Sequence, residues 1–257
     1  MRKIKFAVPA IAITLIGAAR GAEPVPVLLE LFTSEGCSSC PPADELLQKI
    51  DHDQPVPGAD LIVLSEHVDY WNRMGWTDPY SSNDFSRRQQ AYATQFGTDD
   101  IFTPQLVVDG EKAVVGGNWP LAAGAIQQSL RETKIPVKVS AARSGDSARV
   151  HIDIPALSSD GAKGLVYLVL AANHAKSKVT RGENGGRELN HVAVVLSMRQ
   201  VAKVSRKEGV SKDVEVALNP KFDANDMRVV VFVESSRTQR VMGAARASIS
   251  NQQAGTR

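Results

Sequence analysis

A short loop that carries both cysteines of the chain lies between an apolar strand and a helix, and this limits the folds that the chain can adopt. The segment "VPVLLELF", Val25 to Phe32, has Glu30 as its one polar interruption and is typical of a buried strand. "ADELLQKI", at 43–50, has helical spacing. Cys37 and Cys40 lie between the two, in "FTSEGCSSCPP". In an open α/β sheet this place is the carboxyl end of a strand, where functional sites gather.

Strands and helices alternate through the first half of the chain. A second apolar strand, "LIVLSEHV", follows at 61–68, and a polar helix is expected at 83–97, where it ends at a glycine. "TPQLVVDG" predicts a short strand, "KAVVGG" a hairpin partner, and "WPLAAGAIQQSLRE" a last helix that begins near Pro120. This order predicts an α/β domain over residues 23–134.

The character of the sequence changes after Lys134. Segments such as "ARVHIDIPA", "GLVYLVLAA" and "MRVVVFVES" are short, β-branched and often alternating, with glycine, serine, asparagine and aspartate between them. This spacing is typical of an all-β sandwich. We therefore expect an all-β, sandwich-like domain over residues 135–250, followed by a tail at 251–257.

Residues 1–22 have the pattern of a secretory signal peptide. Arg2, Lys3 and Lys5 precede the apolar run "FAVPAIAITLIGAA", and small residues follow it. Cleavage there removes four of the 30 basic residues and none of the 28 acidic ones, so the formal charge changes from +2 to −2. We expect a periplasmic or secreted protein. Its near-neutral mature chain has no basic stripe for nucleic acid or for an anionic membrane.

The cysteine pair has three interpretations. An exported chain meets an oxidising compartment, but two cysteines are too few to staple a chain of 257 residues. If a helix opens at the pair, its positive end lowers the pKa of Cys37, which makes Cys37 the attacking thiolate and Cys40 the resolving one. The alternatives are a disulfide that only fixes the loop of a non-catalytic binding module, and a Cu(I) carrier. Soft thiolates select Cu(I), whereas a closed zinc site needs four ligands.

A proline at the start of a later strand completes the expected site. A thioredoxin-like unit has such a proline beside its cysteines, and "FTPQLVVDG" places Pro104 at this point of the element order. We expect a cis peptide between Thr103 and Pro104, which brings backbone next to the sulfur atoms. The main chain of Thr103 is then free to pair with an extended substrate. A trans proline at an ordinary strand start is the alternative.

Three further ionisable residues are candidates for proton transfer. His67 and Asp69 close the second strand, at the sheet edge where the cysteines are expected, and either can shuttle protons for Cys37 or Cys40. Glu30, seven residues before Cys37, can be a buried carboxylate that accepts the Cys40 proton. The alternatives are a histidine that caps a strand and a glutamate at a sheet edge or in an ion pair.

Two loops are rich in residues that either bind ligands or anchor a fold. Tyr70, Trp71 and Trp76 can line a peptide groove, although such aromatic side chains more often pack in the core. "TRGENGGRELNH", Thr180 to His191, gathers charged residues around glycines. It is either a salt-bridged loop between strands or a contact with the first domain or a ligand.

Several stretches together resemble a known family. "ELFTSEGCSSCPPADELL", "HVDYWNRMGWTDPYS", "RRQQAYA" and "FTPQLVVDG" are similar to an uncharacterised family of secreted bacterial proteins, the domain-of-unknown-function family 1223, which is assigned to the thioredoxin-like superfamily. "GENGGRELNHVAVV" resembles a later motif of the same family, so the likeness covers residues 25–235. The resemblance implies a thioredoxin-like fold and a redox-type site, and it implies no substrate.

The residues and the resemblance together predict an α/β thioredoxin-like N-terminal domain followed by an all-β C-terminal domain. The predicted function is that of a thiol–disulfide oxidoreductase that uses Cys37 and Cys40. We expect no cofactor, no resident metal and no nucleic acid or membrane contact. The expected partners are protein thiols or disulfides, and no oligomeric state is predicted.

Overall fold

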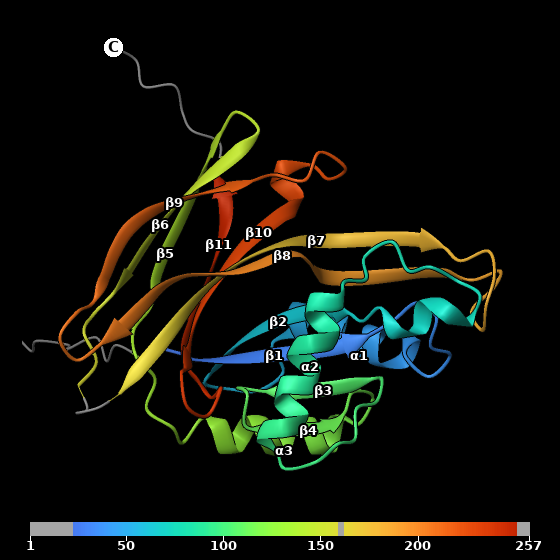
Figure 1. Ribbon diagram of the computed structural model, residues 1–257, viewed down its shortest axis with the longest axis horizontal. Coiled ribbons are helices and arrows are strands. Elements are labelled where there is room, and N and C mark those ends of the chain that lie inside the picture. Colours follow the sequence, from blue (N-terminus) through green and yellow to red (C-terminus); the bar gives the residue numbers. More distant parts are fainter. Residues whose placement is uncertain (1–22, 159–161, 251–257) are drawn as a thin grey trace, which may run out of the picture.

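The computed structural model describes residues 23–158 and 162–250, so the expected signal peptide and tail lie outside the described residues. Within them, eleven strands form one mixed sheet in the order β4-β3-β1-β2-β8-β7-β10-β11-β5-β6-β9 (Figure 1). The strands are β1 (Val25–Thr33), β2 (Ala59–His67), β3 (Gln105–Val108), β4 (Lys112–Val115), β5 (Lys138–Ser144), β6 (Ser147–Ile154), β7 (Lys163–Lys178), β8 (Glu188–Ser205), β9 (Val210–Ala217), β10 (Met227–Ser235) and β11 (Val241–Ser250).

Three α-helices and two short 3₁₀ segments complete the described part of the chain. The α-helices are α1 (Pro41–Asp53), α2 (Asn83–Gln95) and α3 (Trp119–Ser129), and the 3₁₀ segments are η1 (Tyr70–Met74) and η2 (Ala224–Asp226). Of these helices, none is both long and apolar enough to cross a membrane.

Prolines and side-chain caps determine where the helices begin. Pro41 occupies the first turn of α1, where its missing N–H leaves no helical hydrogen bond unmade. A separate turn precedes it, in which the N–H of Cys40 donates to the carbonyl oxygen of Cys37. Ser82 and Asn118 cap α2 and α3 with their side-chain oxygens. The cysteines therefore lie in a tight turn just outside the regular helix.

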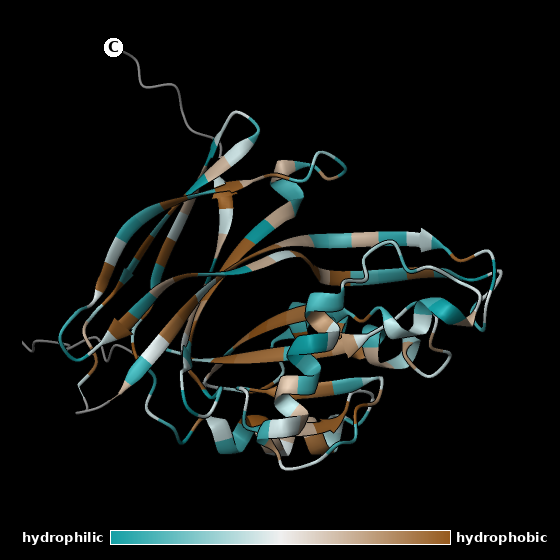
Figure 2. Ribbon diagram, in the orientation of Figure 1, coloured by the Kyte–Doolittle hydropathy of each residue, from teal (hydrophilic) through white to brown (hydrophobic). Residues whose placement is uncertain are grey.

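The parallel strands β1 and β2 form the centre of the first half of the chain. Both are apolar and buried along nearly their whole length (Figure 2). Leu29 and Leu31 pack on one face with Leu47 of α1, in a core that also includes α3. Leu28 packs on the other face with Phe85 of α2 and with side chains of β7 and β10. Burial on both faces fixes the carboxyl ends of β1 and β2 side by side.

The expected fold class, an α/β thioredoxin-like domain followed by an all-β domain, is wrong. The described strands form a single sheet, because β8 pairs in parallel with β2 at Ser65 and Val194. Val192 and Ala193 of β8 also enter the core beside α1. Strand β8 thereby covers an edge of β2 that would otherwise expose unpaired N–H and C=O groups. Short alternating segments predict short strands, whereas β7 has 16 residues and β8 has 18, enough to reach across both halves.

The hairpin of β7 and β8 extends over the first half of the molecule. Its strands are antiparallel up to the pair Lys178 and Glu188, where the turn between them begins. This turn lies at the same end of the molecule as the start of α1 (Figure 1). Residues from distant parts of the sequence therefore meet beside the two cysteines.

Candidate functional site

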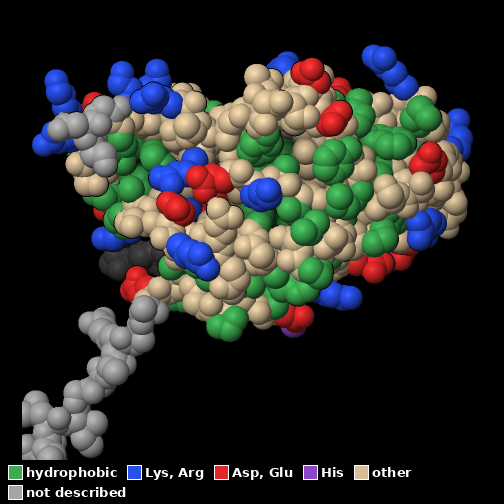
Figure 3. Space-filling model, turned by 90° about the horizontal axis from the view of Figure 1, so that it is seen from below, with side chains coloured by type: hydrophobic (Ala, Val, Ile, Leu, Met, Phe, Trp, Pro, Cys, Tyr) green, Lys and Arg blue, Asp and Glu red, His purple; other side chains and the backbone are tan. Residues whose placement is uncertain are grey.

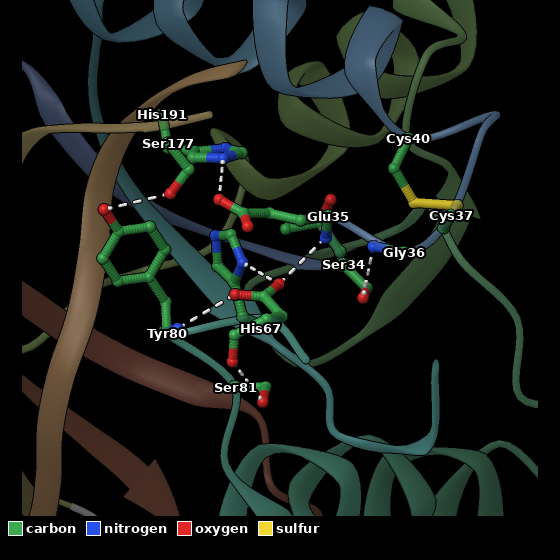
Figure 4. Close-up of polar contacts among 12 residues, drawn as sticks. Ser34, Glu35, Gly36, Cys37, Cys40, His67, Tyr80, Ser81, Ser177 and His191 are labelled. Carbon is green, nitrogen blue, oxygen red and sulfur yellow. Dashed lines mark hydrogen bonds and ion pairs between the residues drawn. A yellow bond between two sulfur atoms is a disulfide. The ribbon is translucent and has the colours of Figure 1, made fainter. Parts of the chain in front are cut away.

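Cys37 and Cys40 form a disulfide at the start of α1 (Figure 4). Their Cα atoms are 5.4 Å apart. Both side chains are 0% exposed, whereas Ser38 and Ser39 between them are exposed. The two serines therefore form the outer surface of the turn and screen the sulfur atoms from solvent.

The Thr103–Pro104 peptide is cis, as predicted. Ser39 connects this peptide to the disulfide, because its Oγ lies 3.4 Å from Cys37 Sγ and donates to the carbonyl oxygen of Thr103 over 3.5 Å. Trp71 holds Thr103 in turn, by donating its Nε1–H to the threonine hydroxyl over 2.8 Å. The structure thus brings the backbone of Thr103 to the disulfide turn.

Two tryptophans anchor the loop that leads to the disulfide. Trp71 packs over Gly36, where an added Cβ would lie 3.2 Å from the Cβ of Trp71, so a larger residue would displace the indole. Trp76 donates its Nε1–H to Oε2 of Glu35 over 2.8 Å. In this structure both side chains support the loop rather than standing free as a peptide groove.

His67 lies at the sheet edge where the sequence analysis placed it. It ends β2 opposite Thr33, the last residue of β1, and its side chain is fully buried. Its Nδ1 donates to Oδ2 of Asp78 over 2.7 Å, and its Nε2 has no hydrogen-bond partner among the described residues. One imidazole nitrogen is therefore committed to a carboxylate and the other is unused.

Asp78 is the carboxylate that organises this edge. Burial is the largest single effect and raises its pKa, but the charge and hydrogen bond of His67 oppose it. The backbone N–H groups of Glu35 and Tyr80, which also donate to its oxygens, add to this lowering. The pKa of Asp78 thus lies below its ordinary value, and a buried ionised Asp78 holds the disulfide loop, β2 and the loop around Tyr80 together.

Asp69 is held by α2. Its Oδ1 accepts from the hydroxyl of Ser86 over 2.6 Å, and the same hydroxyl oxygen accepts the N–H of Asp69 over 3.1 Å. Among the described residues, Asp69 forms no hydrogen bond or ion pair with Cys37 or Cys40. These contacts connect the residue before η1 to α2.

Glu30 lies in an ion-pair network on the α2 face of the sheet. Its oxygens accept from Arg88 Nε and from the hydroxyl of Tyr92, each over 2.6 Å. Side chains alternate along a strand, and the adjacent Leu31 packs with α1, so Glu30 points away from that helix. The structure therefore does not bring Glu30 to Cys40. The alternative of an ion pair, which the sequence also allowed, describes its contacts.

Besides Asp78, two buried acidic residues near the disulfide, Glu35 and Asp44, were not predicted as site residues. Glu35 is the nearest to the disulfide along the chain, two residues before Cys37. Its side chain is fully buried, and its Oε1 lies 3.2 Å from Nε2 of His191. The ring centroid of His191 is 4.7 Å from that of His67, with the rings nearly perpendicular. Figure 4 shows the Glu35 carboxylate between the imidazoles of His191 and His67, with its side chain extending away from the disulfide.

Asp44 lies one helical turn after Cys40, and its N–H donates to the carbonyl oxygen of Cys40. Its Oδ1 accepts from the Thr33 hydroxyl over 2.9 Å, and its Oδ2 is 3.7 Å from Nδ1 of His191, which is ion-pair range but too long for a hydrogen bond. Burial raises the pKa of Asp44 to about 7, because desolvation outweighs the opposing effects of His191 and Thr33. Asp44 therefore exchanges a proton near neutral pH.

The turn between β7 and β8 closes over the disulfide loop. Asn184 is fully buried and donates its Nδ2 hydrogens to the carbonyl oxygens of Glu35 and Cys37, each over 2.9 Å. The neighbouring Glu183 accepts the N–H of Ser38 over 3.0 Å, and hydrogen bonds from Ser38 lower the pKa of its carboxyl. The interpretation of 180–191 as a contact with the first half of the chain is confirmed.

The residues that the sequence analysis missed all lie inside stretches that it quoted. Glu35 and Asp44 flank the cysteines, Asp78 lies in "GWTDPYS", and Asn184 and His191 lie in "GENGGRELNHVAVV". For Glu35 and Asp78 the available signal was a charged residue in a loop between elements. Among the described residues, no group of three or more His, Cys, Asp or Glu side chains has the arrangement of a metal site.

Comparison with known protein families identifies a family that this sequence matches. The model of a protein family of unknown function, DUF1223, matches residues 28–234. The chain belongs to this family. The curated proteins contain no match to this DUF1223 sequence.

Solved structures include a similar chain. Protein AGR_C_4864 from Agrobacterium tumefaciens has 25% sequence identity and a TM-score of 0.67, over 92% of this chain and 100% of its own. A domain of the outer membrane lipoprotein Omp28 from Porphyromonas gingivalis has 19% identity and a TM-score of 0.31, over 47% of this chain and 92% of that one. The first likeness extends over almost the whole DUF1223 chain and supports its overall architecture.

Proposed function

We propose that this DUF1223 protein is a thiol–disulfide oxidoreductase that works through Cys37 and Cys40. The observation that carries the proposal is the place of their disulfide, which joins residues three apart in a turn between β1 and α1. The carboxyl ends of two parallel strands meet there, and buried ionisable side chains surround the turn. This is the part of a sheet where reactive groups are commonly positioned.

A purely structural disulfide at this place would add little stability. In the chain-entropy model a closed loop of this size gives about 2 kcal/mol, against about 4.7 kcal/mol for a loop of roughly 100 residues. The turn is already fixed by hydrogen bonds from Asn184 and by the packing of Trp71 on Gly36. The small structural gain from the disulfide favours a chemical role for it.

The proposed reaction is exchange with a partner dithiol. A partner thiolate attacks Cys37, the sulfur–sulfur bond breaks, and Cys40 leaves with the bonding electrons. The second partner thiol then attacks the mixed disulfide and releases Cys37, so the partner is oxidised and the protein reduced. The reverse sequence reduces a partner disulfide and oxidises Cys37 and Cys40. Because both sulfur atoms are buried, the exposed Ser38 and Ser39 must move aside when the partner binds.

Protein thiols or disulfides in the periplasm or outside the cell are the proposed partners. On the face seen from below in Figure 3, Lys and Arg side chains are interspersed with acidic and hydrophobic ones, which favours protein surfaces over nucleic acid. In the proposed site Thr103 offers backbone beside the sulfur atoms, and His67 lies at the same sheet edge.

The reduction potential of Cys37–Cys40 tests the proposal. The protein is equilibrated with thiol–disulfide buffers, and the free thiols are trapped with a maleimide mass tag and counted. We expect a potential in the range of exchangeable disulfides, about −120 to −270 mV. A potential below about −300 mV, which is typical of inert structural disulfides, would overturn the proposal.

A non-catalytic binding module is the second candidate, and the full burial of both sulfur atoms favours it. In that case the disulfide only holds the turn, and folded protein would resist reduction. The third candidate is a Cu(I) carrier, which would bind the metal through both thiolates of the reduced protein. Equilibrium dialysis of the reduced protein against Cu(I), with Cys37→Ser as the control, would detect it.

A further inference from the structure

A buried row of ionisable side chains runs from α1 across β8 to the loop after β1. Oδ2 of Asp44 is 3.7 Å from Nδ1 of His191, and Nε2 of the same ring is 3.2 Å from Oε1 of Glu35. The three side chains are at most 5% exposed. One imidazole therefore faces two carboxyl groups, each through a different nitrogen.

Both ends of this row adjoin the disulfide turn. Asp44 follows Cys40 by one helical turn, and side chains of a helix lean toward its N-terminus, so the carboxyl is directed toward the turn that holds Cys40. At the other end Glu35 precedes Cys37 by two residues. Its backbone carbonyl shares one amide group, that of Asn184, with the carbonyl of Cys37.

The Asp44 end of the row also reaches toward solvent. A hollow of about 100 Å³ lies between α1 and the beginning of β8, and Asp44, Glu45 and Gln48 are among the residues that line it. A space of this size with polar walls can hold water. Glu35, in contrast, is enclosed by Trp76, His191 and the disulfide loop.

We propose that Asp44, positioned by His191 and Glu35, relays a proton between Cys40 and water when the disulfide reacts, an inference that rests on the proposed function. When the attack on Cys37 expels the Cys40 thiolate, neutral Asp44 transfers its proton to that thiolate and becomes a carboxylate. Water in the hollow then returns a proton to Asp44. In the reverse direction the Asp44 carboxylate takes the proton from Cys40 as its sulfur attacks a mixed disulfide.

His191 is a positioning residue in this relay. Its ring lies between the carboxyl groups of Asp44 and Glu35, and its charge lowers the pKa of Asp44. Further groups on the packed elements influence the same equilibrium. They are His67 at the end of β2, Asp78 and Tyr80 in the loop before α2, and Thr33 on β1.

The test is the pH dependence of the rate at which dithiothreitol reduces the protein disulfide, measured from about pH 5.5 to about pH 8.5. His191→Gln removes the imidazole, and Asp44→Asn keeps the shape of the carboxyl group but cannot exchange its proton. At one end of this range we expect the reduction rate of each variant to differ from that of the wild type by about tenfold. This is the change that a shift of one pKa unit produces. His174→Gln is the matched control, because His174 on β7 is exposed and paired with Asp226. Its profile should follow that of the wild type.

The outcomes separate the relay from the proposed function. If both His191→Gln and Asp44→Asn keep the wild-type profile, the relay is wrong while the exchange reaction stands. If the folded wild-type protein is not reduced by dithiothreitol at any pH in the range, the proposed function fails and the relay fails with it. Circular dichroism of each oxidised variant verifies the fold, and Asp44→Asn carries the test if His191→Gln does not fold.

Discussion

Asn184 and Cys37 are 147 residues apart in the sequence, and the side-chain amide of one donates to the carbonyl oxygen of the other over 2.9 Å. The same amide donates to the carbonyl oxygen of Glu35. Both hydrogens of the amide are thus used, and the turn of the β7–β8 hairpin is fastened to the disulfide loop. Opening of the disulfide to a partner therefore depends on a contact that the second half of the chain supplies.

Replacement of Asn184 by alanine should loosen the disulfide loop. The change removes two buried hydrogen bonds, although the carbonyl oxygen of Cys37 keeps the N–H of Cys40 as a donor. Their loss should lower the free energy of unfolding by roughly 2 kcal/mol. We also expect dithiothreitol to reduce the disulfide about tenfold faster, because local opening of the loop becomes less costly. Denaturant unfolding measures the change in stability. Alkylation of the free thiols at timed intervals measures the rate of reduction.

Asn190→Ala is the control for this prediction. Asn190 is exposed at the start of β8, and its carbonyl oxygen, which accepts from Gln48, is kept in the variant. We expect reduction at the wild-type rate. Equal acceleration in both variants would mean that the hairpin as a whole, and not the Asn184 amide, restrains the loop.

Asp44→Asn should change the pH dependence of stability in the oxidised protein. The pKa of Asp44 is raised to about 7 in the folded state, so the folded protein holds a proton that the unfolded chain loses near pH 4. Wild-type stability therefore falls as pH rises from about 4 through 7, and the asparagine variant lacks this loss. Relative to the wild type, the variant should gain on the order of a few kcal/mol between pH 5 and pH 8.

Urea unfolding at the two pH values measures this gain. Glu45→Gln is the matched control, because Glu45 is the next residue on α1 and its side chain is exposed. Its stability difference from the wild type should be nearly the same at both pH values. A constant difference for Asp44→Asn as well would show that Asp44 ionises normally in the folded protein.

Local pattern predicted the strand, turn and helix around the cysteines because each has a signal within a few residues. The apolar run of β1 and the prolines after Cys40 are examples. The cis peptide at Pro104 also followed from the order of elements. Pairing between Ser65 and Val194 has no such signal, because a parallel contact across 129 residues leaves no trace in either segment. The single sheet was missed for this reason.

The candidate site shows the same difference between local features, which the sequence predicts, and long-range contacts, which it does not. His67 was placed correctly because it ends an apolar strand parallel to β1. Alternation shows that Glu30 and Leu31 face opposite sides, but it does not say which side α1 covers, so Glu30 was connected with the wrong face. Glu35 and His191 were missed as a pair because their contact joins the loop after β1 to β8. Only the tertiary structure brings these two together.

Arg88→Met should destabilise the protein more at neutral pH than at acid pH. The guanidinium binds Glu30 and Glu234 over 2.6 and 2.9 Å, and Glu66 is 3.9 Å away. Burial raises the pKa of Glu66 and of Glu234, and the nearby Glu30 adds to both shifts. Without the arginine these carboxyls lose their counter-charge, at a cost of about 3 to 5 kcal/mol at neutral pH. As pH falls, protonation of the carboxyls should reduce that cost.

Thermal unfolding at pH 7 and pH 5 follows this prediction. Arg87→Met is the control, since Arg87 is the preceding residue on α2 and its ion pair with Asp84 is exposed. Exposed pairs contribute little, so we expect a change of less than about 1 kcal/mol. A pH-independent loss in Arg88→Met would instead point to lost packing against Tyr92 and Phe232.

The order of attack at the disulfide gives the last prediction. Both sulfur atoms are equally buried, so access alone does not distinguish them. Their neighbours do, because Cys37 is followed by exposed Ser38 and Ser39, whereas Cys40 is followed by Pro41, which is buried in the first turn of α1. A partner that displaces the serines reaches Cys37 first, and Cys40 is left to resolve the mixed disulfide. Cys40→Ser should therefore accumulate covalent partner complexes on a non-reducing gel, and Cys37→Ser should accumulate few. The opposite pattern would exchange the two roles, and complexes from neither variant would favour the binding module.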